Sequence, residues 1–205
     1  MIEDRTVAGK MLAEKLNKIV SNPIVLAVPR GGVIVGHEIA IKLGCPLDVI
    51  IAKKITPPDN PEYAIGAIVH DGTLYKGPNW EYYSSTNDFA KEIENKKIEV
   101  IRRLEIYRGN ADYALDKKTV ILVDDGIATG ATIFAILNWL KKMRPREIIL
   151  AIPVIPQSTF EVLQNHTQRI IFLEKPVDFV AVGQFFNNFE QVSDNEVKII
   201  LSKYR

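Results

Sequence analysis

The segment VILVDDGIATGAT, which runs from Val120 to Thr132, decides the fold of this chain. Its apolar start predicts a buried strand over Thr119 to Val123, because a short continuous apolar run is typical of a strand that is covered on both faces. Two adjacent acids, Asp124 and Asp125, follow the strand and lead into a turn rich in glycine and threonine. A helix is predicted next, because apolar side chains then recur at helical spacing on one face. The segment therefore predicts a strand, a turn and a helix in succession.

The same order occurs earlier in the chain. Ile24 to Val28 is a second apolar run, and it ends at the loop Pro29-Arg30-Gly31-Gly32 before a helical pattern over Val33 to Leu43. Further strands are predicted at Leu47–Ala52, Ile148–Val154 and Arg169–Leu173. Strands that alternate with helices need crossover connections, so we predict an α/β fold with a mostly parallel five-stranded sheet and helices on both faces. Ligands on such sheets bind at the carboxyl ends of the strands, where both glycine loops lie.

The middle of the chain, at about residues 55–118, is too long for a simple connection and predicts structure of its own. Gly66 to Tyr75 alternates weakly around Asp71-Gly72, which predicts a hairpin. Asp88 to Arg108 predicts a long polar helix. We therefore predict a single domain over residues 1–205 that carries this segment as an insert.

The charge balance gives no reason to expect a polyanionic partner. Lys and Arg (26) nearly cancel Asp and Glu (25), so no global field draws the chain toward nucleic acid or an anionic membrane. Apolar runs stay short of the length of a membrane-spanning helix, and the N-terminus lacks the pattern of a signal peptide. The single cysteine, Cys45, cannot form an internal disulfide. We therefore expect a soluble cytoplasmic protein that binds neither nucleic acid nor membrane.

The turn that follows the paired acids suits a phosphate group. Glycine amides at a helix N-terminus, helped by the helix dipole, bind a phosphate dianion, and threonine hydroxyls add donors. Asp124 and Asp125 would repel a second phosphate, but they are good acceptors for two vicinal hydroxyls. The lysine of a GxxxxGK[ST] loop is missing, and the pattern is not GxGxxG. The segment therefore indicates a sugar phosphate, with the phosphate on the turn and the hydroxyls on the acids.

The same segment resembles the phosphoribosyl diphosphate (PRPP) signature of the type I phosphoribosyltransferases, in which an apolar run and two aspartates precede the phosphate turn. The resemblance covers the whole chain, including YAIGAI, YRG and AVGQFFNNFEQVSDNEV, and is to the group of phosphoribosyltransferase-domain proteins with unassigned substrates. It implies the type I phosphoribosyltransferase fold, with a flexible hairpin and a C-terminal hood at about residues 174–192. The helical insert departs from the family, whose members have little more than the hairpin at this place. The resemblance also implies a homodimer of nucleotide metabolism that uses PRPP and Mg²⁺ to transfer a 5-phosphoribosyl group to a nucleobase-like or other nitrogenous acceptor, with release of pyrophosphate.

The resemblance also implies how PRPP would bind. The 5-phosphate would lie on the turn, the ribose hydroxyls on Asp124 and Asp125, and the diphosphate on the loop that contains Arg30. In many relatives that loop carries a cis non-proline peptide, for which Arg30–Gly31 is the candidate here. Mg²⁺ prefers oxygen ligands and would be held chiefly by PRPP, with Asp124 and Asp125 as candidate protein ligands. The implied catalytic residues are Arg30, Asp124 and Asp125, and the implied PRPP site comprises Arg30, Gly31, Gly32, Lys53, Lys54, Asp124, Asp125, Gly126, Ala128, Thr129, Gly130, Ala131 and Thr132.

The hood would cover the acceptor. Its segment DFVAVG resembles DxFVVG of the hypoxanthine-guanine phosphoribosyltransferases, which implies that Phe179 stacks on the acceptor and that Val180 contacts it through the backbone. Those enzymes carry an aspartate where this chain has Ala128, and they also have an acid near Asn187. Ala128 instead matches the adenine-type loop DDxxATG, but the hood does not resemble that family's. The acceptor therefore stays open, and core packing stays an alternative role for each phenylalanine of the hood.

Two classes of function stay open. In an enzyme, departure of pyrophosphate leaves an oxocarbenium-like ribose, so neutralisation of the leaving group and exclusion of water would dominate, with no protein nucleophile. The alternative is a non-catalytic PRPP or nucleotide sensor, or a regulatory protein. The absence of a basic stripe argues against binding to nucleic acid. The histidines His37, His70 and His166 are scattered and form no metal-ligand spacing.

Overall fold

The computed structural model describes residues 1–17, 20–57, 60, 63–85 and 87–205, and it divides the chain into two units. The parts of the predicted insert at residues 58–59, 61–62 and 86 lie outside the described residues. The first unit comprises Met1–Ile50, Leu115–Ala128 and Arg144–Arg205, and the second comprises Ile51–Ala114 and Thr129–Met143. Each unit is described by itself.

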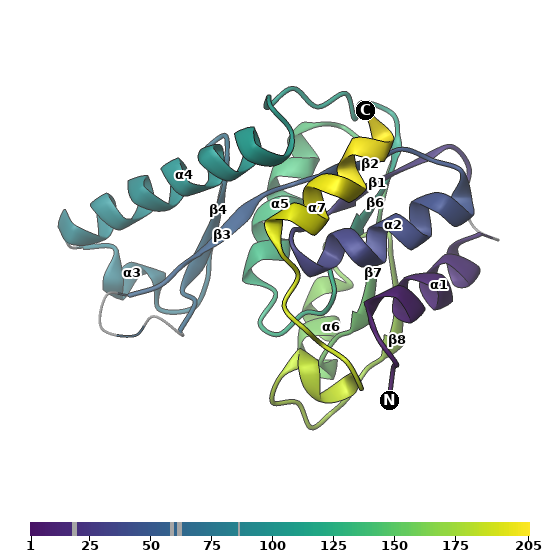
Figure 1. The fold of residues 1–205 in the computed structure, drawn as a ribbon. Helices are drawn as coiled ribbons and strands as arrows, with labels where there is room; N and C mark the ends of the chain where they lie inside the picture. The colour runs from purple at the N-terminus through teal and green to yellow at the C-terminus, as the bar shows by residue number, and fades with distance from the viewer. Residues whose placement is uncertain (18–19, 58–59, 61–62, 86) are drawn as a thin grey trace. The chain divides into compact units, whose positions relative to one another are not determined.

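The first unit contains the five-stranded parallel sheet that the apolar runs predict (Figure 1). Its strands in spatial order are β2 (Leu47–Val49), β1 (Pro23–Ala27), β6 (Thr119–Val123), β7 (Glu147–Val154) and β8 (Arg169–Glu174), and each neighbouring pair is parallel. Every residue of the central strand β6 is buried. A parallel strand covered on both faces has no polar side, which explains why its sequence is continuously apolar.

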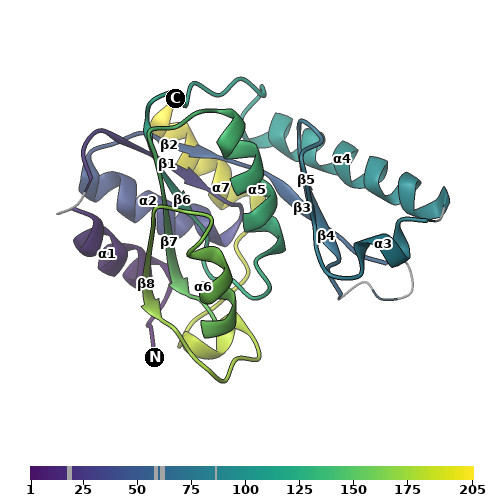
Figure 2. The same cartoon turned by 180° about the vertical axis from the view of Figure 1, so that it is seen from behind.

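Helices lie on both faces of this sheet, as predicted (Figures 1 and 2). α1 (Arg5–Leu16) and α2 (Gly31–Leu43) pack against each other on one face, and α6 (Gln157–Leu163) lies on the other. α2 ends at Gly44, whose φ of 59° is the left-handed conformation that glycine adopts without a steric cost. The remaining helical elements of this unit are α7 (Asp194–Leu201), which contacts α2, and the short 3-10 helices η1 (Val182–Phe185) and η2 (Ser202–Tyr204).

One predicted strand is wrong in its extent. The sequence predicts a single strand over Leu47–Ala52, whereas β2 ends at Val49 and a strand of a different sheet begins at Ala52. Ile50 and Ile51 between them are buried, so burial without strand structure accounts for their apolar character. A hydrophobic pattern reports burial, and it does not mark the residue at which the chain leaves a sheet.

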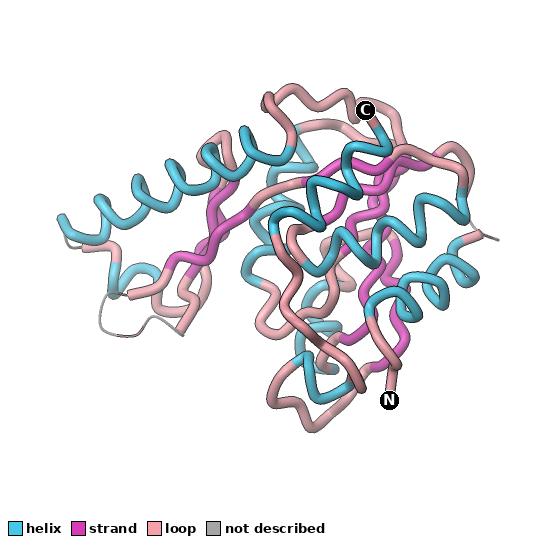
Figure 3. Tube along the Cα trace, in the orientation of Figure 1, coloured by secondary structure: helices cyan, strands magenta, loops and turns pink. Residues whose placement is uncertain are grey.

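The second unit contains an antiparallel sheet formed, in order, by β3 (Ala52–Ile55), β4 (Gly66–Val69) and β5 (Leu74–Lys76). β4 and β5 are the predicted hairpin, and Gly72 in its turn has a φ of 85°. The helices of this unit, shown in cyan in Figure 3, are α3 (Trp80–Tyr83), α4 (Asn87–Tyr107) and α5 (Ala131–Lys142). α4 is the predicted helical insert. In the described part of the chain, no helix is both long and apolar enough to cross a membrane.

The beginning of the chain is hydrogen-bonded to the segment predicted to form the hood. The backbone N–H of Ile2 donates to the carbonyl of Phe185 at 2.8 Å, and the N–H of Asn187 donates back to the carbonyl of Ile2 at 2.8 Å. The N–H of Asn188 then donates to the carbonyl of Glu3 at 2.9 Å. An apolar cluster joins the same segments; its members are Ile2, Ala8, Val154 and Phe186, with Leu173, Phe179, Val182, Phe185 and Phe189 packed against them. Residues 2–3 therefore help to hold the segment predicted to form the hood, about residues 174–192, which is called the tail below.

Candidate functional site

The paired acids lie at the carboxyl end of β6, beside the chain that leaves β1. The backbone N–H of Val28 donates to the carbonyl of Val123 at 2.8 Å, so the two chains still run side by side where the strands end. The Oδ1 atom of Asp124 accepts a hydrogen bond of 2.9 Å from the backbone N–H of Asp125. Both aspartates are half-buried. Their carboxylates thus occupy the edge of the sheet at which α/β folds bind ligands.

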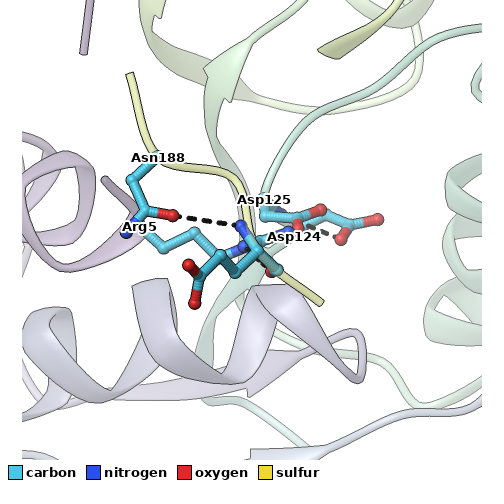
Figure 4. Close-up of polar contacts among 5 residues, drawn as sticks. Arg5, Asp124, Asp125 and Asn188 are labelled. Carbon is cyan, nitrogen blue, oxygen red and sulfur yellow. Dashed lines mark hydrogen bonds and ion pairs between the residues drawn. The ribbon is translucent and has the colours of Figure 1, made fainter. Parts of the chain in front are cut away.

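Asp125 is paired with Arg5, the first residue of α1 (Figure 4). The Nε atom of Arg5 lies 2.6 Å from Oδ2 of Asp125, and the two side chains are only 12% and 19% exposed. The same guanidinium group donates from NH1 to the carbonyl of Glu190 at 2.8 Å, and its central carbon lies 3.7 Å from the centroid of the Phe189 ring. One side chain therefore contacts both the acid of the signature and the tail segment.

The glycine loop that follows β1 contacts these acids so closely that no side chain fits between them. A Cβ atom on Gly31 would lie 1.8 Å from Oδ2 of Asp125 and 2.6 Å from Nε of Arg5. A Cβ atom on Gly32 would lie 2.9 Å from the Cα atom of Asp124. The structure thus brings together Gly31, Gly32 and the two acids, all of which the sequence analysis selects. Their role in binding stays a prediction.

Arg30 precedes α2 and is held by an ion pair of its own. Its NH1 atom lies 3.5 Å from Oδ1 of Asp194, the first residue of α7, with the two side chains 26% and 49% exposed. The cis peptide expected at Arg30–Gly31 is found one residue earlier, at Pro29–Arg30. Gly31 already begins α2, so the peptide at which the cis bond was expected belongs to the start of a helix. The side chain of Arg30, the N-cap residue, makes no capping hydrogen bond to the first amides of this helix.

The turn predicted to bind a phosphate follows the acids in the chain and precedes α5. A Cβ atom on Gly126 would lie 2.2 Å from Cγ1 of Val182, so a side chain at this position would collide with the tail. Ala128 is exposed, and its carbonyl accepts a hydrogen bond of 2.7 Å from the hydroxyl of Thr159. In the second unit, Gly130 precedes α5 with a φ of 77°, and no side chain caps that helix. The remaining residues selected in this turn are Thr129, which is exposed, Ala131, which is buried, and Thr132, which is half-buried.

The two lysines selected for the diphosphate lie on β3 in the second unit. The Nζ atom of Lys53 lies 3.2 Å from Oε2 of Glu99 on α4, and Lys54 is exposed. Glu99 also pairs with Lys96 at 3.4 Å. Burial raises the pKa of Glu99, but hydrogen bonds and charge from Lys53 and Lys96 outweigh burial and lower it overall. Lys53 therefore has an internal carboxylate partner.

The two residues selected for the acceptor differ in their surroundings. Phe179 is half-buried in the apolar cluster and stacks on Phe185, with 6.0 Å between ring centroids and 11° between planes. Val180 is 88% exposed, and its backbone N–H donates to Oε1 of Gln184 at 3.1 Å. Asn187 donates from Nδ2 to the carboxylate of Glu3 at 2.7 Å. Phe179 thus has a packing role in the tail, whether or not it also contacts an acceptor.

Sequence reasoning missed Arg5 and the cavity beside it. The cavity has a volume of about 220 Å³ and is lined by Asp4, Arg5, Thr6, Ile34, Asn188, Glu190, Gln191, Val192 and Glu196. The sequence predicts no role for Asp4 or Arg5. In the structure, Asp4 caps α1 by accepting a hydrogen bond of 2.8 Å from the N–H of Val7. No local pattern relates Arg5 to an acid 120 residues away.

The donor set fits Mg²⁺ only as an ion held mainly by a substrate. Within residues 1–17, 20–57, 60, 63–85 and 87–205, no group of three or more His, Cys, Asp and Glu side chains could hold a metal ion. Asp124 and Asp125 offer the carboxylate oxygens that Mg²⁺ prefers, although one oxygen of Asp125 is hydrogen-bonded to Arg5. The remaining ligands of such an ion would have to be water and substrate oxygens.

Cys45 and His37 lie outside the site. Burial raises the pKa of the Cys45 thiol to about 11, so it is protonated and a poor nucleophile at neutral pH. Burial, followed by the charge of Lys203, lowers the pKa of His37, whose Nδ1 atom lies 2.8 Å from the hydroxyl of Tyr204. Burial is the main cause of the pKa shift of each side chain, so neither shift indicates a role in the site.

Comparison with known proteins agrees with the fold and the signature. The family model described as the phosphoribosyl transferase domain matches residues 2–184. Rv0571c of Mycobacterium tuberculosis (strain ATCC 25618 / H37Rv), which carries the provisional name of a phosphoribosyl transferase, is 35% identical over 207 aligned residues. The alignment covers 99% of this chain and 47% of that protein, so the chain spans about half the length of the curated relatives it matches.

Two solved structures extend the comparison. TT1426 from Thermus thermophilus is 36% identical, with a TM-score of 0.83 over 99% of this chain and 98% of that one. The purine phosphoribosyltransferase from Pyrococcus horikoshii Ot3 is 20% identical, with a TM-score of 0.52 over 91% of each chain, and it shares the fold. The match of the family model to residues 2–184 shows that the chain belongs to the phosphoribosyl transferase domain family.

Proposed function

We propose that the chain is a phosphoribosyltransferase domain that transfers the 5-phosphoribosyl group of PRPP to a nitrogenous small-molecule acceptor and releases pyrophosphate. The observation that carries the proposal is the close contact of Gly31 and Gly32 with Asp124 and Asp125. This contact sets the uncapped N-terminus of α2 beside two carboxylates, and a helix N-terminus suits a phosphate whereas paired carboxylates suit hydroxyls. A molecule that carries both groups on one pentose is the ligand that this arrangement fits.

Each part of PRPP has a proposed set of contacts. The 5-phosphate binds the turn Ala128–Thr132, through backbone amides and the hydroxyls of Thr129 and Thr132. The ribose hydroxyls bind Asp124 and Asp125. The diphosphate binds the last proposed group, which consists of Arg30, Gly31, Gly32, Lys53 and Lys54. The chemistry of these donors supports the assignment of the diphosphate site, because amides, guanidinium and ammonium groups all bind phosphate oxygens.

The reaction needs no nucleophile from the protein. The bond between ribose C1 and the diphosphate oxygen breaks, and the pyrophosphate leaves with the bonding electrons. The lone pair of the acceptor nitrogen forms the new bond to C1, and the proton of that nitrogen passes to water or to the released pyrophosphate. Arg30 and the loop amides stabilise the charge that develops on the leaving group, and the acids hold the ribose through its hydroxyls. Mg²⁺, when bound to the diphosphate, supplies further neutralisation of that charge. Asp124 and Asp125 are the side chains that would contact the ion.

The acceptor and the assembly complete the proposal. A flat nucleobase-like ring would stack on Phe179 and contact the backbone at Val180, in a hood of about residues 174–192.

We also propose that residues 1–205 act as one phosphoribosyltransferase domain, with an insert at about 55–118, in a cytoplasmic homodimer of nucleotide metabolism. The balanced charge supports a protein with no nucleic-acid or membrane partner. Light scattering on the purified chain tests the dimer.

A non-catalytic PRPP or nucleotide sensor is the second candidate. The observation that favours it is that two of the proposed ligands already have internal partners, Asp125 with Arg5 and Lys53 with Glu99. A site whose charged groups are already paired can bind a ligand without being arranged for its transition state. Such a protein would bind PRPP and release no pyrophosphate.

A titration and an activity assay on the same samples separate these functions. PRPP is titrated into the chain by calorimetry in the presence of Mg²⁺, and pyrophosphate release is then followed with a panel of purine, pyrimidine and other nitrogenous acceptors. An enzyme gives binding and acceptor-dependent release, whereas a sensor gives binding alone. The double substitution Asp124→Asn plus Asp125→Asn should abolish binding, and Asp116→Asn, at an exposed carboxylate, is the matched control. Unchanged PRPP affinity in the double variant would show that the site is assigned to the wrong residues.

A further inference from the structure

We propose that Arg5 is a positioning residue for the ribose-hydroxyl site, which it serves by fixing the carboxylate of Asp125 and tying the tail to it. The proposal rests on the proposed function, because it concerns how the same site binds PRPP. It adds a residue from the start of the chain, outside both glycine loops.

The first argument is the geometry at Asp125. The Nε atom of Arg5 takes Oδ2 at 2.6 Å, so Oδ1 is the oxygen left to accept a hydroxyl. The missing side chain of Gly31 leaves room for this contact, since a Cβ atom there would lie 1.8 Å from Oδ2. A carboxylate held on one oxygen by a planar guanidinium group loses rotational freedom, and a pre-oriented acceptor binds its ligand at a lower entropic cost.

The second argument is burial. Only 12% of the Arg5 side chain and 19% of the Asp125 side chain are exposed. Exposed ion pairs contribute little to structure, but removal of one partner of a shielded pair leaves a charge that water does not fully solvate. Asp125 without Arg5 would therefore move toward solvent or recruit another cation, and in both cases the hydroxyl acceptor would be displaced.

The third argument is the connection to the tail. The guanidinium group donates to the carbonyl of Glu190 at 2.8 Å and lies over the ring of Phe189. The Phe189 ring in turn packs on Phe186 in the apolar cluster, with 4.8 Å between ring centroids. Arg5 thus fixes the position of Asp125 relative to the packed tail, and the acid is not positioned by its own loop alone.

The test is a double-substitution cycle read by PRPP affinity in the presence of Mg²⁺. The variants are Arg5→Gln, Asp125→Asn and their combination. Lys10→Gln is the matched control, because it removes a positive charge from an exposed position of the same helix. Arg5→Lys is included because it keeps the charge but loses the planar group that stacks on Phe189. Urea unfolding of each variant identifies the conditions under which all of them are folded.

We expect Arg5→Gln to weaken PRPP binding about tenfold, which corresponds to the loss of one hydrogen bond to a charged group. Arg5→Lys should lie between Arg5→Gln and the unsubstituted chain, and Lys10→Gln should bind as the unsubstituted chain does. In the Asp125→Asn background, Arg5→Gln should have no further effect, because the group that Arg5 positions is already altered.

Three results would overturn the proposal. Unchanged or tighter binding by Arg5→Gln would mean that Arg5 does not position the acid for PRPP. An equal loss in the Asp125→Asn background would mean that Arg5 acts by another route. Both results require that the unsubstituted chain binds PRPP and leave the proposed function standing. Failure of the unsubstituted chain to bind PRPP would overturn the proposed function together with this role for Arg5.

Discussion

Two cation–carboxylate pairs, one in each unit, differ in how far they are shielded from water. Arg5 and Asp125 in the first unit are 2.6 Å apart and 12% and 19% exposed. Lys53 and Glu99 in the second unit are 3.2 Å apart and 31% and 46% exposed. The arginine has two further partners in the tail, and Glu99 has a second lysine. A cation–carboxylate pair that is shielded and has further partners is thus a fixed part of the structure, whereas a more exposed pair is a contact that can be exchanged.

The difference in shielding suggests different roles for the two cations, Arg5 and Lys53, in the proposed reaction. A shielded and multiply bonded guanidinium group holds its geometry, so Arg5 suits the positioning of an acid. A half-buried lysine that is paired through one ammonium group with an exposed glutamate can exchange this carboxylate for a phosphate at little cost. Lys53 thus suits direct contact with a diphosphate, and Glu99 would be its partner while the ligand is absent.

The largest effect is expected at Gly31, next to the shielded pair. Gly31→Ala should weaken PRPP binding by roughly a hundredfold or more, because the methyl group displaces Asp125 and Arg5 together. It should also lower the free energy of unfolding by about 1–3 kcal/mol, a typical cost of overpacking. Gly72→Ala is the control, since nothing lies within 4 Å of its added methyl group and only its φ of 85° is unfavourable. Calorimetry measures the PRPP affinity, and urea unfolding measures the free energy of unfolding. Normal PRPP affinity in Gly31→Ala would show that the loops can accommodate the added methyl group.

The second prediction compares the two cations directly. Arg5→Met should lower the free energy of unfolding by about 2 kcal/mol, because it leaves a shielded carboxylate without its counter-charge. Lys53→Met should change it by less than about 0.5 kcal/mol, as for other exposed pairs. Urea unfolding of both variants measures the difference. Equal losses would mean that exposure does not separate the two pairs.

The third prediction concerns ligand binding by the exposed pair. If Lys53 contacts the diphosphate, Lys53→Gln should weaken PRPP binding about threefold to tenfold, as expected for loss of one charged contact. Glu99→Gln should strengthen binding by about twofold, because Lys53 no longer has to leave a carboxylate. Titrations at about 50 mM and about 300 mM salt should show the Lys53 effect shrinking as charges are screened. A Lys53→Gln variant that binds normally at low salt would remove Lys53 from the site.

The smallest effect expected is the pH dependence of the stability that the Lys53–Glu99 pair contributes. Burial raises the pKa of Glu99, but Lys53 and Lys96 outweigh it and lower the pKa overall. A carboxyl group whose pKa is lower in the folded state stabilises that state above its unfolded pKa of about 4.3, and the contribution is lost as pH falls through the lower value. Carboxyl-carbon NMR should therefore show the Glu99 pKa rising in Lys53→Met. A titration curve identical in the two proteins would mean that Lys53 and Glu99 do not interact in solution.

The sheet and both glycine loops could be predicted from the sequence, because each is encoded locally. The run from Thr119 to Val123 is apolar because both faces of β6 are covered, and the acids follow where the strand ends. The hairpin around Gly72 and the helix α4 also follow local patterns. The site residues contained in those loops could be selected for the same reason.

The contacts of Arg5 and the break after Val49 could not be predicted in this way. Arg5 meets partners 120 and 185 residues away, and nothing next to it in the chain reports that distance. Ile50 and Ile51 continue the apolar run of β2 because they are buried, although the strand has ended. Local patterns thus predict which surfaces are covered, and they leave open which distant segment covers them.

The hydrogen bonds that join residues 2–3 to residues 185–188 also set the order in which this region can form during synthesis. Arg5 leaves the ribosome before Glu190, whose carbonyl group follows 185 residues later in the chain. A nascent chain can therefore build β1, β6 and both glycine loops while residues 2–5 still lack their partners at residues 185–190. We expect the guanidinium group to settle on Asp125 only after residues 185–190 have emerged, so a chain stalled before that point would carry the signature without the contacts that fix it.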